Sequence, residues 1–228
     1  MAIRPIFIAK KSKIGVELVN IEFKFYTGFA KTQKAKSIEA LHESARLRGY
    51  ENILEVSTKS EEEFGRKLSA FNLSAITQKG IFYTVESAFQ SSKVFENGER
   101  YVDIFKKSSL DAKRDERIRN SGRVIEFNFF KYQIPINPRT FFYDWLYINI
   151  LLNNQYFLDN QDKLNEFDIF TDIEFNPEKS FNSQAHALAL FKSLTLNNIS
   201  LIDLKNPDYF RDVVYKGEAE GQLYFKFE

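Results

Sequence analysis

The chain has 228 residues, of which 43% are hydrophobic, and its formal net charge is +1. A chain of this length buries roughly 70 to 75% of its unfolded surface, so a stable core needs no covalent cross-links. The lack of cysteine excludes a disulfide framework and a thiolate metal site. With only His42 and His186 available, a histidine-based metal site is not expected either, and we predict neither a metal nor a cofactor.

The charges are divided unevenly along the chain. Residues 1–123 carry a balance of +7 and residues 124–228 a balance of −6. This asymmetry fits either an anionic ligand on the basic side or a basic patch that pairs with the acidic half of the same molecule. The longest apolar-leaning run, 141–152, is too short to cross a bilayer, and residues 1–13 lack the apolar stretch of a secretory signal. We therefore expect a soluble, cytoplasmic protein with no membrane partner.

The first elements in chain order are two strands and a helix. Hydrophobic alternation predicts strands over 3–9 and 16–25, and apolar spacing predicts a helix over 33–48 that ends before Gly49. Three lysines, Lys31, Lys34 and Lys36, lie at the start of this helix, where cations oppose the helix dipole. They fit a bound anion or, more simply, a solvated face.

A short strand over 52–57 leads to a polar turn and then to the most informative helix. The turn contains Arg66 and Ser69, whose side chains could donate to a phosphate or a ribose. After it, Thr84 is a suitable N-cap and Gly98 a suitable stop for a helix of about three turns that reaches Phe95. On that helix Glu86, Gln90 and Lys93 have the spacing i, i+4 and i+7, which puts them on one side. Such a stripe is usually just the solvated side of an amphipathic helix.

The second half of the chain is predicted to be mainly helical. Helices are expected over 99–105, 109–120, 139–153 and 159–166, and a last one is expected to end near 194. The helix over 139–153 is apolar nearly all round and should be central. Basic residues around Arg123 are where contacts to a nucleic acid backbone would be sought. Alternation over 222–227 would suit a final strand.

The run Thr84-Val85-Glu86-Ser87-Ala88-Phe89-Gln90-Ser91-Ser92-Lys93 resembles the signature of the NADAR family. Further matches are the segment Leu68-Ser69-Ala70-Phe71-Asn72, Asp172, and Asn182 before the last helix. Where the family has Trp-Gly after the Asp, this chain has Ile173-Glu174-Phe175, and Ser183-Gln184 replaces the usual Leu-Gly after the Asn. The segment 28–34 is similar more specifically to NADAR members associated with DarT-type toxins.

This resemblance implies an α+β fold, a mainly helical single NADAR domain with a small sheet and an N-terminal strand-helix extension. The extension would be 1–67, the core 68–194 and a C-terminal extension 195–228. Family members are N-glycosidases, and the DarT-associated ones imply removal of ADP-ribose from guanine in DNA as the antidote to a toxin that adds it. The implied partners are ADP-ribosylated DNA, the ADP-ribose product and a cognate DarT-type toxin. The implied catalytic residues are Glu86, Lys93 and Asp172. The implied ligand-binding residues are Arg66, Ser69, Phe71, Asn72, Gln90 and Asn182.

Cutting an N-glycosidic bond requires a proton for the leaving nitrogen and stabilisation of the anomeric carbon. Glu86, partly buried beside Phe89, would supply the proton. Lys93 would act either as an ammonium beside Glu86 or as a free amine that forms a Schiff base with an opened sugar. Two other functions stay open: a small-molecule N-glycosidase of the riboflavin or ADP-ribose type, and a non-catalytic antitoxin that binds ADP-ribose or the toxin.

Overall fold

A computed structural model describes residues 1–28 and 30–216. The fold mixes helix and sheet, with 42% helix and 19% strand, so the α+β class is confirmed. Helices account for less than half of the residues that the structure describes, and the strands in this part of the chain form three separate sheets in place of one small sheet. Within the described residues, no helix is long and apolar enough to span a membrane.

The largest sheet has four strands in the order β2-β1-β9-β3. The strands β1 (Ala2–Ala9) and β2 (Val16–Phe23) form an antiparallel hairpin, close to the predicted ranges. The strand β9 (Ile169–Thr171) pairs antiparallel with β1 and parallel with β3 (Ile53–Glu55). Segments from the predicted extension and from the predicted core therefore share one sheet. The division of the chain at 67 and 194 remains a prediction.

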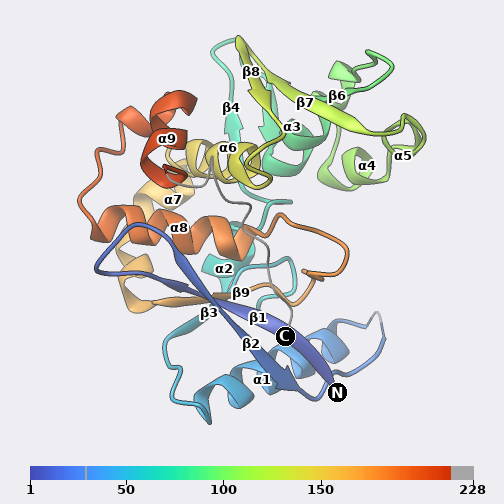
Figure 1. The fold of residues 1–228 in the computed structure, drawn as a ribbon. Helices are drawn as coiled ribbons and strands as arrows, with labels where there is room; N and C mark the ends of the chain where they lie inside the picture. The colour runs from blue at the N-terminus through green and yellow to red at the C-terminus, as the bar shows by residue number, and fades with distance from the viewer. Residues whose placement is uncertain (29, 217–228) are drawn as a thin grey trace.

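Two helices cover the two faces of this sheet (Figure 1). Alternating residues of β1 point to opposite sides, so that Ile6 packs in the small cluster that contains Leu41 of α1 (Lys31–Arg46). The neighbouring Phe7 belongs to the main core, where its ring lies 5.7 Å from that of His186 on α8 (Gln184–Leu196). The hairpin of β1 and β2 is thus one layer between α1 and α8.

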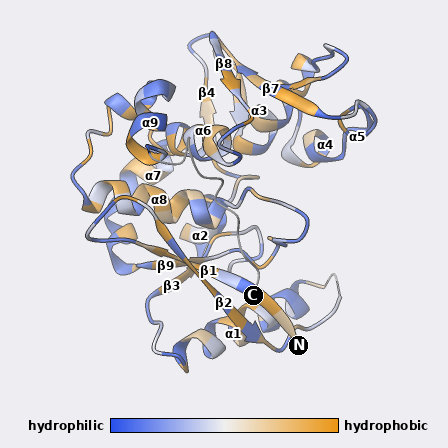
Figure 2. Ribbon diagram, viewed as in Figure 1, coloured by the Kyte–Doolittle hydropathy of each residue, from blue (hydrophilic) through white to orange (hydrophobic). Residues whose placement is uncertain are grey.

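The main core is built around α6 (Phe141–Leu151), which is almost entirely buried, as its all-round apolar sequence predicted. Against it lie α3 (Val85–Ser91) and the sheet of β6 (Lys93–Phe95), β7 (Val124–Phe129) and β8 (Tyr132–Pro135). The rings of Phe127 and Phe142 stack at 4.4 Å between the sheet and α6. Figure 2 shows hydrophobic colour along β7 and hydrophilic colour on α5 (Glu116–Asn120), at the edge of the molecule.

Short elements complete the fold. They are α2 (Glu63–Lys67), β4 (Ser74–Ile76), β5 (Phe82–Thr84), η1 (Val102–Lys106), α4 (Ser109–Arg114), α7 (Gln155–Asn160), η2 (Gln161–Glu166), η3 (Asp203–Lys205) and α9 (Pro207–Val214). The strand expected at 222–227 lies outside the described residues.

Several predicted helices differ from those observed. The segment expected to be one helix over 109–120 is broken at Asp115, whose carboxylate caps α5 and binds Lys107 and Arg117. These local contacts compete with helix continuation. The segment 99–105 forms only a short 3-10 helix, η1. The hairpin of β7 and β8 was not predicted at all.

Candidate active site

The helix α3 carries the first group of candidate residues. Its start is fixed by a capping box, in which the Thr84 side chain accepts from the Ser87 backbone N–H and the Ser87 side chain accepts from that of Thr84. The helix ends at Ser91, so the prediction of a helix that reaches Phe95 was wrong. Residues Lys93–Phe95 instead form β6 and pair with β7, a long-range contact that overrides local helix preference.

The three polar side chains predicted to share one side are nevertheless joined. The Gln90 amide nitrogen donates to Glu86 Oε1 at 2.8 Å, and Lys93 Nζ donates to Gln90 Oε1 at 2.7 Å. Glu86 is 7% exposed and Gln90 is 9% exposed, so this chain of hydrogen bonds is largely shielded from water. The solvated-stripe alternative is therefore wrong: these residues point into the protein.

Lys93 has unusual surroundings for an amine. Its Nζ lies 5.1 Å from the centre of the Phe89 ring. Burial lowers the pKa of Lys93 to about 8, against the opposing effect of the nearby Glu86 charge. A part of the Lys93 population is therefore an uncharged amine at neutral to mildly alkaline pH, which is the form that attacks a carbonyl carbon.

Hydrogen bonds connect α3 to the turn after α2, and connect that turn to the start of α8. The Glu86 backbone N–H donates to the Ala70 carbonyl at 3.1 Å, and the Ala70 N–H donates to Gln184 Oε1 at 2.6 Å. The Gln184 side chain also hydrogen-bonds Asp172, which follows β9. Gln184 thereby links the segment beneath Glu86 to the second candidate carboxyl group.

Asp172 lies in a buried and negatively charged environment. Its side chain is 7% exposed, and its Oδ1 accepts from the Glu174 backbone N–H at 3.1 Å. Burial, and then the charge of Glu55 on β3, raise the pKa of Asp172 well above its usual value. Burial also raises the pKa of Tyr143 on α6, with further contributions from the charges of Glu86 and Asp172. The phenol of Tyr143 therefore lies within the electrostatic reach of both candidate carboxyl groups.

Three of the predicted ligand-binding residues stabilise the turn after α2. Ser69 Oγ and Asn72 Nδ2 both donate to the Arg66 carbonyl at 2.8 Å. The Arg66 guanidinium donates to the carbonyl groups of Ser60 and Glu61. Arg66, Ser69 and Asn72 are thus brought together, but these donors contact backbone carbonyls, and ligand binding by them stays a prediction.

Besides Gln90, two predicted ligand-binding residues remain: Phe71 in the same turn and Asn182 before α8. The Phe71 ring is half-buried, with Lys113 Nζ of α4 at 5.0 Å from its centre. Asn182 lies in the loop before α8, and its Oδ1 is buried without a hydrogen-bond partner among the described residues. An amide oxygen in this state is available to a ligand hydroxyl group.

Sequence reasoning missed Glu55, Tyr143 and Gln184. Glu55 was detectable in principle, because a carboxylate within the apolar run Ile53-Leu54-Glu55-Val56 is unusual for a buried strand. Tyr143 gave no signal, since it belongs to a helix that is apolar nearly all round. Gln184 was noted only as a departure from the family pattern.

Two surface hollows, of about 390 Å³ and 350 Å³, lie away from Glu86. The first lies between Tyr132 and α9, and the second is lined by the N-terminal strand, Glu22 and Glu178. Within the part of the chain that the structure describes, no group of three or more His, Cys, Asp and Glu residues is placed to hold a metal ion.

Comparison with known families gives a match that covers nearly the whole chain. A family model described as the DarT1-associated NADAR antitoxin matches residues 2–222. No curated protein matches the chain. The match includes the relay of Glu86, Gln90 and Lys93, Asp172, and both strands of the N-terminal hairpin.

Proposed function

The chain belongs to the family of DarT1-associated NADAR antitoxins, and from this premise we propose that it hydrolyses the N-glycosidic bond between ADP-ribose and guanine in DNA. Membership in this family makes it an antitoxin with a cognate DarT toxin as its partner. The observation that carries the proposed activity is the buried relay from Glu86 through Gln90 to Lys93. Buried ionisable groups with perturbed pKa values cluster at catalytic sites, and Glu86 and Lys93 are linked here through Gln90.

The proposed roles of the two carboxyl groups follow from their surroundings. The reaction needs one carboxylic acid, which protonates the leaving guanine nitrogen, and one carboxylate, which stabilises the electron-poor anomeric carbon. Asp172 suits the first role, because burial and the charge of Glu55 raise its pKa. Glu86 suits the second, because its Oε1 accepts a hydrogen bond from Gln90. This assignment differs from the one expected from sequence, which gave the proton to Glu86.

Lys93 has two possible roles in this reaction. As an ammonium it holds Gln90 in place by donating to its amide oxygen. As an amine, favoured by a pKa of about 8, it attacks the anomeric carbon of the opened sugar and forms a Schiff base. The bond from that carbon to the guanine nitrogen breaks, guanine leaves with a proton, and water then hydrolyses the Schiff base to release ADP-ribose and the free amine. Borohydride trapping of the substrate on Lys93 distinguishes the two: a trapped adduct shows the amine, and an untrapped, fully active enzyme leaves only the electrostatic role.

The proposed function is tested with an oligonucleotide that carries ADP-ribose on guanine. Wild-type protein is expected to release free ADP-ribose, detected by mass, and Glu86→Gln to reduce the rate by at least about 100-fold. The melting temperature of the variant should stay close to that of the wild type, because glutamine retains the size of the side chain and one acceptor oxygen.

Three outcomes separate the proposal from its alternatives. Turnover of modified free nucleotides without turnover of modified DNA would identify a small-molecule N-glycosidase. Thermal stabilisation by ADP-ribose without any turnover would identify a binding antitoxin. Full activity of Glu86→Gln would remove Glu86 from the mechanism.

A further inference from the structure

The carboxyl group of Glu55 is the least expected feature in the core of the N-terminal sheet. It is 3% exposed and lies on β3, where Glu55 pairs with Thr171 of β9 in a parallel register. Its Oε2 accepts from Thr171 Oγ1 at 2.7 Å, and its Oε1 accepts from the Ile173 backbone N–H at 2.9 Å. Both oxygens therefore act as acceptors, which is the arrangement expected for an ionised carboxylate.

The hydroxyl group of Thr171 extends this arrangement to α1. Thr171 Oγ1 donates its only proton to Glu55, yet it also contacts His42 Nε2 at 2.8 Å. In that contact Nε2–H must be the donor, which fixes the tautomer of His42. Burial, and then the charge of Arg46, lower the pKa of His42 to about 4, so the ring is neutral. His42 therefore orients Thr171 toward Glu55 without adding a positive charge.

Asp172 lies between Thr171 and Ile173, the two residues whose hydrogen bonds hold Glu55, and its pKa responds to the charge of Glu55. Two buried carboxylates close together are costly, because each loses its hydration and each repels the other. The cost is reduced when the pair holds one proton. Glu55 accepts three hydrogen bonds, from Ile173, Ser57 and Thr171, whereas Asp172 accepts two, from Glu174 and Gln184, so the negative charge is better stabilised on Glu55 and the proton belongs on Asp172. Burial, and then Glu55, raise the pKa of Asp172 well above its usual value, in agreement with this placement.

We propose that Glu55 is a positioning residue for the hydrolysis: its carboxylate, held by Thr171 and Ile173, keeps the proton on Asp172 until the glycosidic bond breaks. This inference rests on the proposed function for its chemical step. Asp172 then gives its proton to the guanine nitrogen as the bond from that nitrogen to the anomeric carbon breaks. Water adds its hydroxyl to the anomeric carbon, and the remaining proton of that water restores the acid form of Asp172.

Other charged and polar groups also affect the pKa values of Glu55 and Asp172. Burial raises the pKa of Glu55 as well, hydrogen bonds from Ile173, Ser57 and Thr171 lower it, and the charge of Glu174 raises it. Asp172 is faced by Glu174, by Gln184, and by the phenols of Tyr143 and Tyr147. Burial lowers the pKa of Arg4 on β1, and the charges of Glu178 and Asp172 raise it. The Nε of Arg4 has no hydrogen-bond partner among the described residues.

The first test is spectroscopic and independent of turnover. Carbon NMR or infrared spectroscopy of the whole protein at pH 7 should show a protonated carboxyl group that is absent from Asp172→Asn. The same signal should disappear in Glu55→Gln, because the neutral amide no longer repels a charge on Asp172. An ionised Asp172 in the wild type, or a protonated Asp172 in Glu55→Gln, would overturn the proposal.

The second test uses the pH profile of kcat/KM on modified DNA. Glu55→Gln should shift the alkaline limb to lower pH by at least about one unit, which is about a tenfold lower rate on that limb. A uniform loss of rate at every pH would indicate a merely structural role and contradict the proposal. If the wild type does not turn over modified DNA, the proposed function fails, while the spectroscopic result still decides where the proton lies.

A matched pair of variants covers the case in which Glu55→Gln does not fold. Thr171→Val keeps the shape of the side chain but removes one donor from Glu55, so the shared proton should move from Asp172 toward Glu55. Thr171→Ser keeps the hydroxyl group and should retain the wild-type signal and pH profile. Identical spectra and profiles for the two variants would argue against Glu55 as the group that sets the protonation of Asp172.

Discussion

At the scale of single residues, the candidate site depends on Gln90 as much as on the charged groups. Its amide donates to Glu86 and accepts from Lys93, so one neutral side chain orients both. Helical periodicity placed the three residues on one side correctly for Glu86 and Gln90, which both lie on α3. Lys93 also lies beside Gln90, as predicted, but it is not on the helix. It is the first residue of β6, where the backbone has changed direction after α3.

Gln90→Met should lower the rate of ADP-ribose release by about 10- to 100-fold. Methionine fills a similar volume but makes neither hydrogen bond, so Glu86 and Lys93 lose their fixed orientation. The measurement is turnover of modified DNA together with the melting temperature. Ser91→Ala, on the same buried helix, is the control and should stay close to the wild-type rate. A fully active Gln90→Met would show that the relay is dispensable.

His42 should make the protein sensitive to mild acid. Its pKa in the folded protein is about 4, below the usual 6.5, so protonation favours the unfolded state. The contribution is therefore fully present above pH 6.5 and is lost as the pH falls from 6.5 through 4. The free energy of unfolding should drop by about 2 kcal/mol between pH 7 and pH 5 from this residue alone.

Urea unfolding of the wild type and of His42→Gln at several pH values measures this effect. Glutamine can still donate to Thr171 but does not titrate, so the drop attributed to His42 should disappear. Parallel pH curves for the two proteins would contradict the assignment.

At the scale of secondary structure, the elements that could be predicted are those with a local signal. The first two strands, the first helix and α6 follow from alternation or apolar spacing, and their observed bounds differ by only a few residues. The hairpin of β7 and β8 could not be predicted from the sequence, because its turn carries Phe130 and Lys131 where glycine or asparagine is usual. Phe130 takes a positive φ of 49°, a conformation that its side chain does not favour.

The packing of α2 on β3 gives a prediction at this scale. A Cβ at Gly65 would lie 2.0 Å from the Glu55 carbonyl oxygen and 2.8 Å from Ser60 Oγ. Gly65→Ala should therefore push α2 away from β3 and lower the free energy of unfolding by about 3 kcal/mol. Chemical denaturation measures the change, and Lys67→Ala, exposed on the same helix, is the control. An unchanged stability would mean that α2 can shift without loss.

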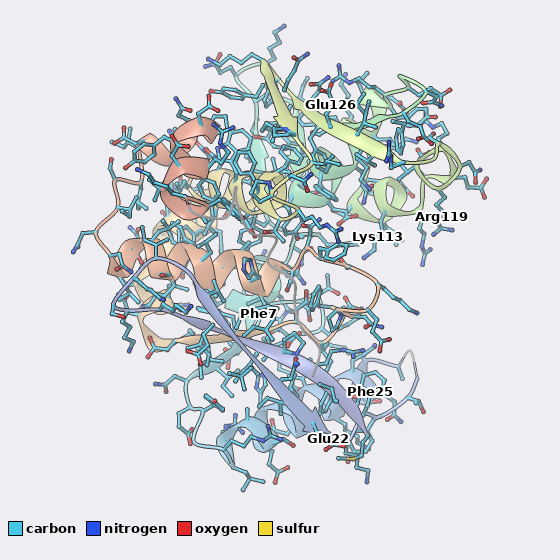
Figure 3. The ribbon with its side chains drawn as sticks, in the orientation of Figure 1. Phe7, Glu22, Phe25, Lys113, Arg119 and Glu126 are labelled. Atoms are coloured by element: carbon cyan, nitrogen blue, oxygen red, sulfur yellow. The ribbon has the colours of Figure 1, made fainter. Side chains whose placement is uncertain are left out.

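At the scale of the whole molecule, the excess of positive charge in the first half has a specific location near the candidate site. Figure 3 shows Lys113 and Arg119 on the same side of the segment formed by α4 and α5, away from Glu126 of β7. Lys113 lies over Phe71, the residue that follows Ala70 beneath Glu86. Neither Lys113 nor Arg119 forms an ion pair with another described residue, unlike Arg117, which binds Asp103 and Asp115.

We expect this segment to contact the phosphates of the DNA substrate. The double change Lys113→Glu and Arg119→Glu should lower kcat/KM on modified DNA by about 10- to 100-fold and weaken its dependence on salt. Turnover of a modified mononucleotide should stay unchanged. The control is Lys205→Glu on η3, a single substitution with the same change of charge as each of the two substitutions in the double variant. Equal effects of the double change on DNA and on the mononucleotide would argue against a DNA-binding role.

The position of β9 determines when the candidate site can form during synthesis. This strand lies between β1 and β3, although more than a hundred residues separate it from either along the chain. Pairings between such distant segments form slowly, because a long loop must close first. A nascent chain that ends before residue 169 has Glu86 and Lys93 but neither Asp172 nor the strand that joins it to Glu55. Under the proposed function, protection from the toxin has to wait until about three quarters of the chain has left the ribosome.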